Sequence, residues 1–377
     1  MARFKKAGLL CAITAAFCMI AGSAFAGPIW KFGDEDQGLL KLDYKGQFQL
    51  KNVDAGADDS TEFNFRRNRL ALMGAYGQNF SLYLQTEYTE DNFDSASGTD
   101  TDKFQLLDAV MRFKLNDSAN LWVGKFKYNL TRENLEACEM PLTLDRSTLI
   151  RAPFVSTRDK GVALWGNLFD NKFQYRVDAM NGADDSTDSN IRYSARAHVT
   201  LLDPEKGYGY KGTYLGKKQV LTIGAAYQFE DEVATDGMGD AVDYSAWTVD
   251  LFAEYPVEDV GTFTFSTAYV DYDMDDAYQA GDPEAGVIGY NGEKNGSYVK
   301  VGYLFPNLPL QLFARSENWS YAQTGDIYDQ EIDWLGLGFN YYLRGQNLKL
   351  TVEYSQMEFD KELDDVDTLT AQLQLIF

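Results

Sequence analysis

The sequence predicts an all-β protein, a transmembrane antiparallel β-barrel of about 16 strands. Apolar and polar residues alternate along most of the chain, as in the closing stretch, where one face carries Leu369, Ala371, Leu373, Leu375 and Phe377. Aromatic residues make up 14% of the chain. Beyond residue 26, no segment approaches the roughly 18 apolar residues of a membrane-spanning helix. The beginning of the chain indicates export, which is the third observation.

Residues 1–26 have the features of a cleaved signal peptide. Three basic residues (Arg3, Lys5 and Lys6) precede an apolar run over 7–20, and Ala24-Phe25-Ala26 forms a small-x-small cleavage site. A lipoprotein is the alternative, but neither cysteine of this segment follows a lipobox. We therefore expect a signal peptide over 1–26 and a single barrel domain over 27–377.

The strands follow one another with little between them. In the first, Leu40, Leu42 and Tyr44 alternate with charged residues, which is the period of a β-strand. The same pattern, interrupted by Asp-rich or Gly/Asn-containing segments, predicts these strands: 40–52, 64–76, 80–90, 103–115, 121–127, 160–167, 173–181, 191–201, 219–229, 244–255, 262–272, 297–305, 310–318, 333–343, 347–355 and 368–377.

Connections alternate between short turns and long loops. Even-numbered strands are followed by short turns such as 77–79 and 344–346, and odd-numbered strands by longer loops; the connection 202–217 is the exception. Short periplasmic turns and long extracellular loops are typical of a bacterial outer-membrane barrel. A set of soluble β-sandwiches would need linkers between domains, and none is visible. About 16 strands leave room for a water-filled lumen.

The polar face of each strand would line that lumen. Its basic residues are candidates for the pore wall: Lys41, Lys45, Arg67, Arg69, Arg192 and Arg196. Two interpretations remain open at this stage. The polar residues could merely solvate a channel, or their positive charge could guide anions.

The longest irregular segment, 128–158, is the best candidate for a functional loop, because loops of this length without a function are uncommon. Its arginines are the candidate constriction residues: Arg132, Arg146, Arg151 and Arg158. Arginine keeps its charge and binds phosphate or carboxylate with two donors. The loop could fold into a wide barrel and narrow it; the alternative is a surface loop that packs at a subunit interface.

Aromatic residues near the predicted strand ends suit the two girdles that border a membrane. The predicted girdle residues are Tyr44, Tyr76, Tyr88, Trp122, Trp165, Trp247, Tyr255, Tyr269, Trp334 and Tyr341.

Catalysis and cofactor binding have little support in this sequence. It contains one histidine, His198, and one cysteine beyond residue 26, Cys138, so no zinc or haem motif can form. No Gly-x-Ser-x-Gly nucleophile motif is present. The net charge of −23 disfavours nucleic acid as a partner. We expect no enzyme activity, no cofactor and no metal.

Three short motifs resemble the phosphate-selective porin O and P family. They are Val123-Gly-Lys-Phe-Lys127 and Arg158-Asp-Lys-Gly-Val162, which flank the long segment, and Phe65-Arg-Arg-Asn-Arg69. The terminal Phe377 agrees with them. The resemblance implies a sixteen-stranded outer-membrane porin, usually a homotrimer, whose third long loop folds into the pore.

The expected function is passive diffusion of small hydrophilic solutes or ions across the bacterial outer membrane, with a preference for anions such as phosphate or another oxyanion. One alternative is a general or weakly cation-preferring porin without a specific solute site. An alternative of another class is a structural or adhesive barrel without transport. The expected partners are solutes or anions, outer-membrane lipid and other copies of the chain in a homotrimer.

Overall fold

The computed structural model describes residues 27–34, 37–56, 59–89, 103–147, 157–182, 190–235, 241–274, 294–324, 327–361 and 363–377. The predicted signal peptide, 1–26, lies outside them. The described elements are β1 (Ile29–Phe32), β2 (Gly38–Asp54), β3 (Ser60–Tyr76), β4 (Phe80–Thr89), β5 (Lys103–Asn116), β6 (Ala119–Phe126), α2 (Arg132–Leu135), β7 (Asp159–Leu168), β8 (Phe173–Met180), β9 (Arg192–Thr200), β10 (Val220–Thr235), β11 (Ala241–Val257), β12 (Gly261–Asp273), β13 (Lys294–Leu304), β14 (Leu310–Thr324), β15 (Ile327–Gln346), β16 (Leu348–Phe359) and β17 (Val366–Ile376).

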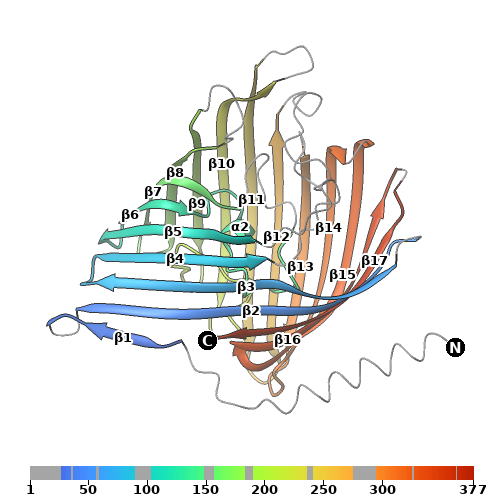
Figure 1. Ribbon diagram of the computed structural model, residues 1–377. Coiled ribbons are helices and arrows are strands. Elements are labelled where there is room, and N and C mark those ends of the chain that lie inside the picture. Colours follow the sequence, from blue (N-terminus) through green and yellow to red (C-terminus); the bar gives the residue numbers. More distant parts are fainter. Residues whose placement is uncertain are drawn as a thin grey trace.

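Strands β2 to β17 form one closed antiparallel barrel (Figure 1). Each strand pairs with the next along the chain, and the last strand, β17, pairs back onto β2 from Ile376↔Lys45 to Asp367↔Asp54. The sixteen strands predicted from alternation therefore correspond, in order, to β2–β17. Closure leaves none of these sixteen strands as a free edge, which removes the usual site of edge-to-edge aggregation.

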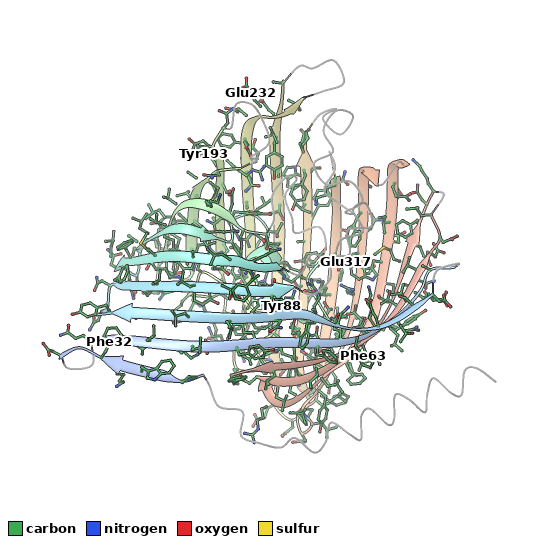
Figure 2. The ribbon with its side chains drawn as sticks, in the orientation of Figure 1. Phe32, Phe63, Tyr88, Tyr193, Glu232 and Glu317 are labelled. Carbon is green, nitrogen blue, oxygen red and sulfur yellow. The ribbon has the colours of Figure 1, made fainter. Side chains whose placement is uncertain are left out.

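Side-chain exposure separates the two faces of the wall. Along β9 the burial pattern alternates strictly, with Arg192, Ser194 and Arg196 buried inside and the residues between them on the outside. Phe63 and Tyr193 are 64% and 46% exposed on the outer face, whereas Glu317 is 1% exposed inside (Figure 2). The polar face thus lines the lumen and the apolar face suits lipid, as the alternation predicts.

Two features of the wall differ from the prediction. The four-residue strand β1 was not predicted; it pairs with Gly38–Lys41 of β2, beyond the point where β17 ends on the same edge. The β10–β11 and β14–β15 hairpins are longer than predicted, reaching Thr235↔Ala241 and Thr324↔Ile327. Apolar alternation stops where a strand leaves the membrane, but backbone pairing continues into water, so alternation underestimates strand length.

The girdle prediction is wrong for the tryptophans Trp122, Trp165 and Trp334. Trp122 stacks on Tyr208 with 4.0 Å between ring centroids, and Trp165 is 9% exposed, both inside the barrel. Trp334 lies under the Arg315 guanidinium, also in the lumen. The aromatic residues on the outer face include Tyr76, Trp247, Tyr255, Tyr269 and Tyr341. Among the described helices, none is long or apolar enough to cross a membrane.

Candidate functional site

The loop between β6 and β7, residues 127–158 and here named L3, enters the lumen. The structure describes 127–147 and 157–158 of it. Its single helical turn, α2, is capped by Thr131, whose side chain accepts a hydrogen bond from the Asn134 amide. All four residues of α2 are buried, including the charged Arg132 and Glu133. L3 therefore fills part of the barrel and does not lie on its surface.

The wall formed by β13–β16 holds the far side of L3. Lys300 of β13 binds the Glu133 carboxylate at 2.7 Å, and Asn340 of β15 donates to the Leu142 carbonyl at 2.8 Å. A Cβ at Gly302 would overlap the Leu142 side chain, so glycine permits this close approach. The buried ion pair, the neutral hydrogen bond and the close packing together fix L3 against one side of the lumen.

Strand β3, three strands further round the barrel from β16, also holds L3. A β-bulge between Gln47 and Phe48 of the β2 pairing leaves Arg66 without a partner residue, and both Arg66 and Arg67 bind Asp145 of L3, at 2.6 and 2.8 Å. Burial alone would raise the pKa of Asp145, but the two guanidinium groups and Arg146 hold it well below its usual range. The bulge thus directs two neighbouring arginines to one carboxylate.

A second segment enters the lumen from the end that carries the short turns. This insert, residues 201–219, connects β9 to β10 and pairs with L3: Tyr210 donates to the Leu135 carbonyl at 3.2 Å, and its own carbonyl accepts from Ala137 at 3.0 Å. The Gly212 amide donates to Met140 at 2.9 Å. A Cβ at Gly212 would overlap the L3 backbone, so this residue must be glycine.

An ion pair joins the two segments. Arg132 of L3 binds Glu205 of the insert through both carboxylate oxygens, at 2.8 and 2.9 Å, with both residues almost fully buried. Burial would raise the pKa of Glu205, but Arg132 lowers it to about 2, so the pair stays ionised. Arg132 also lies over the rings of Tyr210 and Phe252, at 4.4 and 4.0 Å.

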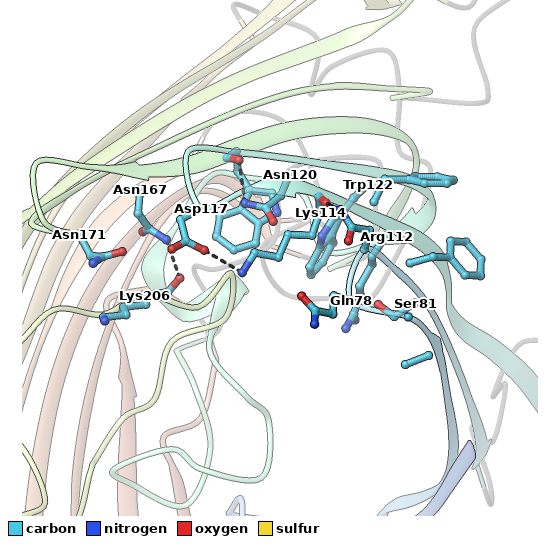
Figure 3. Close-up of a pocket in the computed structure, with 16 residues that line it drawn as sticks. Gln78, Ser81, Arg112, Lys114, Asp117, Asn120, Trp122, Asn167, Asn171 and Lys206 are labelled. Atoms are coloured by element: carbon cyan, nitrogen blue, oxygen red, sulfur yellow. Dashed lines mark hydrogen bonds and ion pairs between the residues drawn. The ribbon is translucent and has the colours of Figure 1, made fainter. Parts of the chain in front are cut away.

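Two neighbouring cavities remain open beside β2–β6. The inner cavity, about 400 Å³, lies between this wall and the inner ends of L3 and the insert. The mouth cavity, about 460 Å³, opens among the short turns (Figure 3). Arg112 of β5 and Trp122 of β6 are the residues that line both. We name this shared boundary of the two cavities the neck.

Three carboxylates neutralise most of the cations around the inner cavity. Lys45 binds Glu139, Arg69 binds Glu87 and Arg158 binds Asp108, at 2.5, 2.7 and 3.0 Å. Burial would raise the pKa of Glu139, but Lys45 lowers it below its usual range. Each of these pairs presents little net charge to a passing solute.

Two cations of the inner cavity have no carboxylate partner among the described residues. Lys127 donates to the Glu136 carbonyl and lies 3.6 Å from the Cys138 sulfur. Burial, with help from Arg146, lowers its pKa to about 7. Arg112 lies over the rings of Tyr83 and Trp122, at 4.9 and 4.3 Å, and its Nε is buried without a partner. Positive charge without a carboxylate partner therefore lies at the neck, and at the L3 side of the inner cavity beside the Cys138 sulfur.

The structure separates the predicted site residues into groups. Lys45, Arg69 and Arg158 line the inner cavity, whereas Arg67 and Arg146 bind L3 itself. Arg132, Arg192 and Arg196 are 0–2% exposed and hold carboxylates away from both cavities. Lys41 pairs with Asp43, and Arg151 lies outside the described residues.

Arg112 and Lys127 were not among the predicted site residues. Alternation does place Arg112 on the lumen face, but it does not show which cations lack carboxylate partners. That distinction depends on pairing across the lumen. His198 is 1% exposed and its ring nitrogen lies 2.7 Å from the Tyr210 hydroxyl. Within the described ranges, no group of three or more His, Cys, Asp or Glu side chains could hold a metal.

The model of the family "phosphate-selective porin O and P" matches residues 39–377. The chain belongs to this family. The resemblance expected from the short motifs is confirmed, and with it the porin function: this member of the porin O and P family is a β-barrel of the bacterial outer membrane that lets solutes diffuse passively through its lumen. The short turns, the insert and the mouth cavity accordingly lie on the periplasmic side.

Solved structures with a similar fold are also outer-membrane barrels. The porin resembles OprB of Pseudomonas putida, with a TM-score of 0.60 and 12% identity over 90% of this chain and 94% of that one. It resembles the outer membrane channel DcaP of Acinetobacter baumannii, with a TM-score of 0.55 and 16% identity over 92% and 99%. A protein of Aquifex aeolicus is 23% identical over 84% of this chain and 80% of its own length.

Proposed function

We propose that this porin passes small hydrophilic solutes through the conduit formed by the inner and mouth cavities, with a preference for anions. The observation that carries the proposal is the neck, where Arg112 lies beside Trp122 and makes no ion pair among the described residues. A solute that moves from one cavity to the other passes this unpaired guanidinium. Arginine keeps its charge at all physiological pH values, so the contribution of Arg112 to the preference does not depend on proton uptake.

The wall residues predicted from the sequence take a supporting part in this proposal. Lys45, Arg69 and Arg158 shape the inner cavity, while their carboxylate partners cancel most of their charge. Arg67, Arg146 and Arg132 hold L3 in place. Lys41, Arg192 and Arg196 remain wall residues outside the conduit. Selectivity then depends on the few cations without partners.

Reversal potentials across planar bilayers in a potassium chloride gradient test the proposal. The unaltered channel should show a reversal potential on the anion side, and Arg112→Gln should shift it toward cations. Arg344→Gln is the matched control, because Arg344 is exposed at the periplasmic end of β15 and should leave the reversal potential unchanged. A cation-side potential in the unaltered protein would contradict the anion preference. Absence of conductance would favour a structural or adhesive barrel.

The remaining expectations form part of the same proposal. The mature chain begins at Gly27, which amino-terminal sequencing of the outer-membrane form tests.

The porin assembles as a homotrimer in outer-membrane lipid. Support comes from its similarity to OmpT of Vibrio cholerae, solved in a trimer form, with a TM-score of 0.54 and 12% identity over 90% of this chain and 99% of that one. Native mass spectrometry in detergent measures the oligomer. Transport requires no cofactor, and the protein is not an enzyme.

A further inference from the structure

The mouth cavity holds several polar groups that the fold does not use. The side-chain amides of Gln78 and Asn171 and the ammonium of Lys206 line it and make no hydrogen bond or ion pair with the rest of the described chain. The Trp165 indole nitrogen is buried there without a partner. Gln78 and Lys206 are exposed and Asn171 is half-buried, so water can serve these three groups and a solute can replace that water. The buried indole nitrogen is different, because buried polar atoms are normally satisfied, and it indicates a place where a solute or water supplies a hydrogen-bond acceptor.

These groups surround the cavity from several elements. Figure 3 shows Gln78 and Arg112 on one side, and Asn171 and Lys206 on the other. They come from the β3–β4 turn, from β5, from the β7–β8 turn and from the insert. The volume of about 460 Å³ lies in the range of ordinary small-molecule sites. A solute in this cavity would therefore meet donors on opposite sides.

The chemistry of the lining indicates the class of solute. Each amide offers two donors and an acceptor, which suits hydroxyl groups that both donate and accept. Trp122 and Trp165 meet edge to face, with 6.1 Å between ring centroids and an interplanar angle of 89°, and add an apolar surface with an N–H donor. Amides beside tryptophan suit a solute with several hydroxyls on a carbon chain or ring.

The positive charge of the cavity lining indicates that the solute carries one acidic group. Lys114 is already paired with Asp117 at 2.7 Å, which leaves Arg112 at the inner end and Lys206 at the rim. A guanidinium binds a carboxylate or phosphate group through paired donors. Inorganic phosphate would use the cations and leave the amides without partners.

We propose that the mouth cavity is a binding subsite for polyhydroxylated organic anions, that is, sugar acids and sugar phosphates. The acidic group contacts Arg112, and the hydroxyls contact Gln78, Asn171 and the Trp165 indole. This inference rests on the proposed function, because it assigns a solute class to the same conduit. Binding here retains such solutes at the periplasmic exit long enough to interrupt the flow of small ions.

Current block in planar bilayers tests the subsite in the unaltered protein. Gluconate, glucose, acetate and inorganic phosphate are added separately to the periplasmic side, and the concentration that halves the potassium chloride current is measured. Gluconate carries both a carboxylate and several hydroxyls, so it should halve the current at about a tenfold lower concentration than glucose or acetate. Glucose 6-phosphate should resemble gluconate. If acetate or phosphate blocks as strongly as gluconate, the subsite does not recognise hydroxyls and the proposal is wrong.

Two variants separate this inference from the anion preference. The double variant Gln78→Ala with Asn171→Gly removes both side-chain amides, and glycine tolerates the positive φ of 65° at position 171. In this variant, block by gluconate should fall to the level of block by acetate. The reversal potential should stay unchanged. Arg112→Gln should weaken gluconate block and shift the reversal potential. Asn307→Ala, in a periplasmic turn outside the cavity, is the matched control. Unchanged gluconate block in the amide variant would overturn the subsite and leave the anion preference standing.

Discussion

Polar side chains line both halves of the barrel interior, but their surroundings differ. On the side of β10–β16, lumen residues such as Glu254, Gln311 and Thr351 have no exposed surface. On the side of β2, the lumen side chains of Lys45 and Asp43 keep 18% and 15% of their surface exposed. L3 and the insert cover the first half and leave the second open. The alternating strands form both walls, and L3 and the insert determine which half contains the open cavities.

The difference between the two halves separates the basic residues that stabilise the interior from those that can select ions. In the filled half, carboxylates neutralise the basic residues in buried ion pairs such as Arg192–Glu230 and Arg196–Asp250. These pairs stabilise the interior. In the open half, Arg112 and Lys127 have no carboxylate partner among the described residues. A basic residue in the lumen therefore indicates selectivity only where it lacks a counter-charge.

Removing the insert should have the largest effect on this comparison. Replacing residues 204–218 with Asn-Gly joins β9 and β10 through a two-residue turn, since the amide of Asp203 already donates to the Gln219 carbonyl at 2.7 Å. The lumen then loses Tyr208, which lines the inner cavity, and Tyr210, and single-channel conductance should rise several-fold. Conductance equal to that of the unaltered protein would show that the insert does not limit the pore.

Breaking the ion pair between L3 and the insert should have the next largest effect. Glu205→Gln leaves the Arg132 charge buried without its partner, which costs about 3–5 kcal/mol for such a pair. We expect a lower melting temperature of the interior, followed by tryptophan fluorescence, and greater open-channel noise. Glu258→Gln, at an exposed turn between β11 and β12, is the control and should behave as the unaltered protein. Equal noise in both would contradict the role of this pair.

A pH titration should reveal the charge on Lys127. Its pKa is lowered to about 7, so the ammonium is charged below pH 7 and neutral above it. Burial, with help from Glu133, raises the pKa of Glu136 to about 8, and this carboxyl gains negative charge over the same range. Anion preference should therefore fall as pH rises from 6 to 9.

Two substitutions divide this pH effect. Lys127→Arg keeps the charge at all these pH values and should remove the larger part, because Lys127 lines the inner cavity. Glu136→Gln should remove the smaller part, because Glu136 is 2% exposed and does not line either cavity. The measurement is the reversal potential at each pH. A flat profile in the unaltered protein would show that neither group titrates in this range.

The smallest effect is expected at Cys138. Burial would raise the pKa of this thiol, but Arg146, Lys127 and Arg69 hold it well below its usual range. The lowered pKa favours the thiolate, so Cys138→Ser should remove negative charge from the inner cavity and shift the reversal potential slightly toward anions at pH 7. A shift toward cations would indicate that the thiol is protonated and that the substitution has disturbed L3.

Alternation predicted the wall well because the signal is local: one face meets lipid and the other meets water. It placed Arg69 and Arg112 in the lumen from their neighbours alone. The role of each residue depends on partners far along the chain, such as Asp145 for Arg67, 78 residues away. Single-sequence patterns do not contain that pairing.

The insert is a second feature whose position could not be predicted from the sequence pattern. Its length stood out as an exception among the short turns, but nothing in residues 202–217 shows that the segment folds into the lumen. Trp122 and Trp165 were misplaced because tryptophan suits both a membrane girdle and a stacked interior. Tyr208 of the insert decides between them by covering both rings, with centroids 4.0 and 5.6 Å away.

The filled half gives this porin an apolar centre of the kind found in water-soluble proteins. Leu130, Tyr210, Tyr244, Trp319 and Ile332 pack together inside the wall, each at most 1% exposed. Heating should therefore produce two transitions. The centre loses its fixed packing first and changes the near-ultraviolet circular dichroism, while the surrounding cylinder keeps its far-ultraviolet signal until a higher temperature.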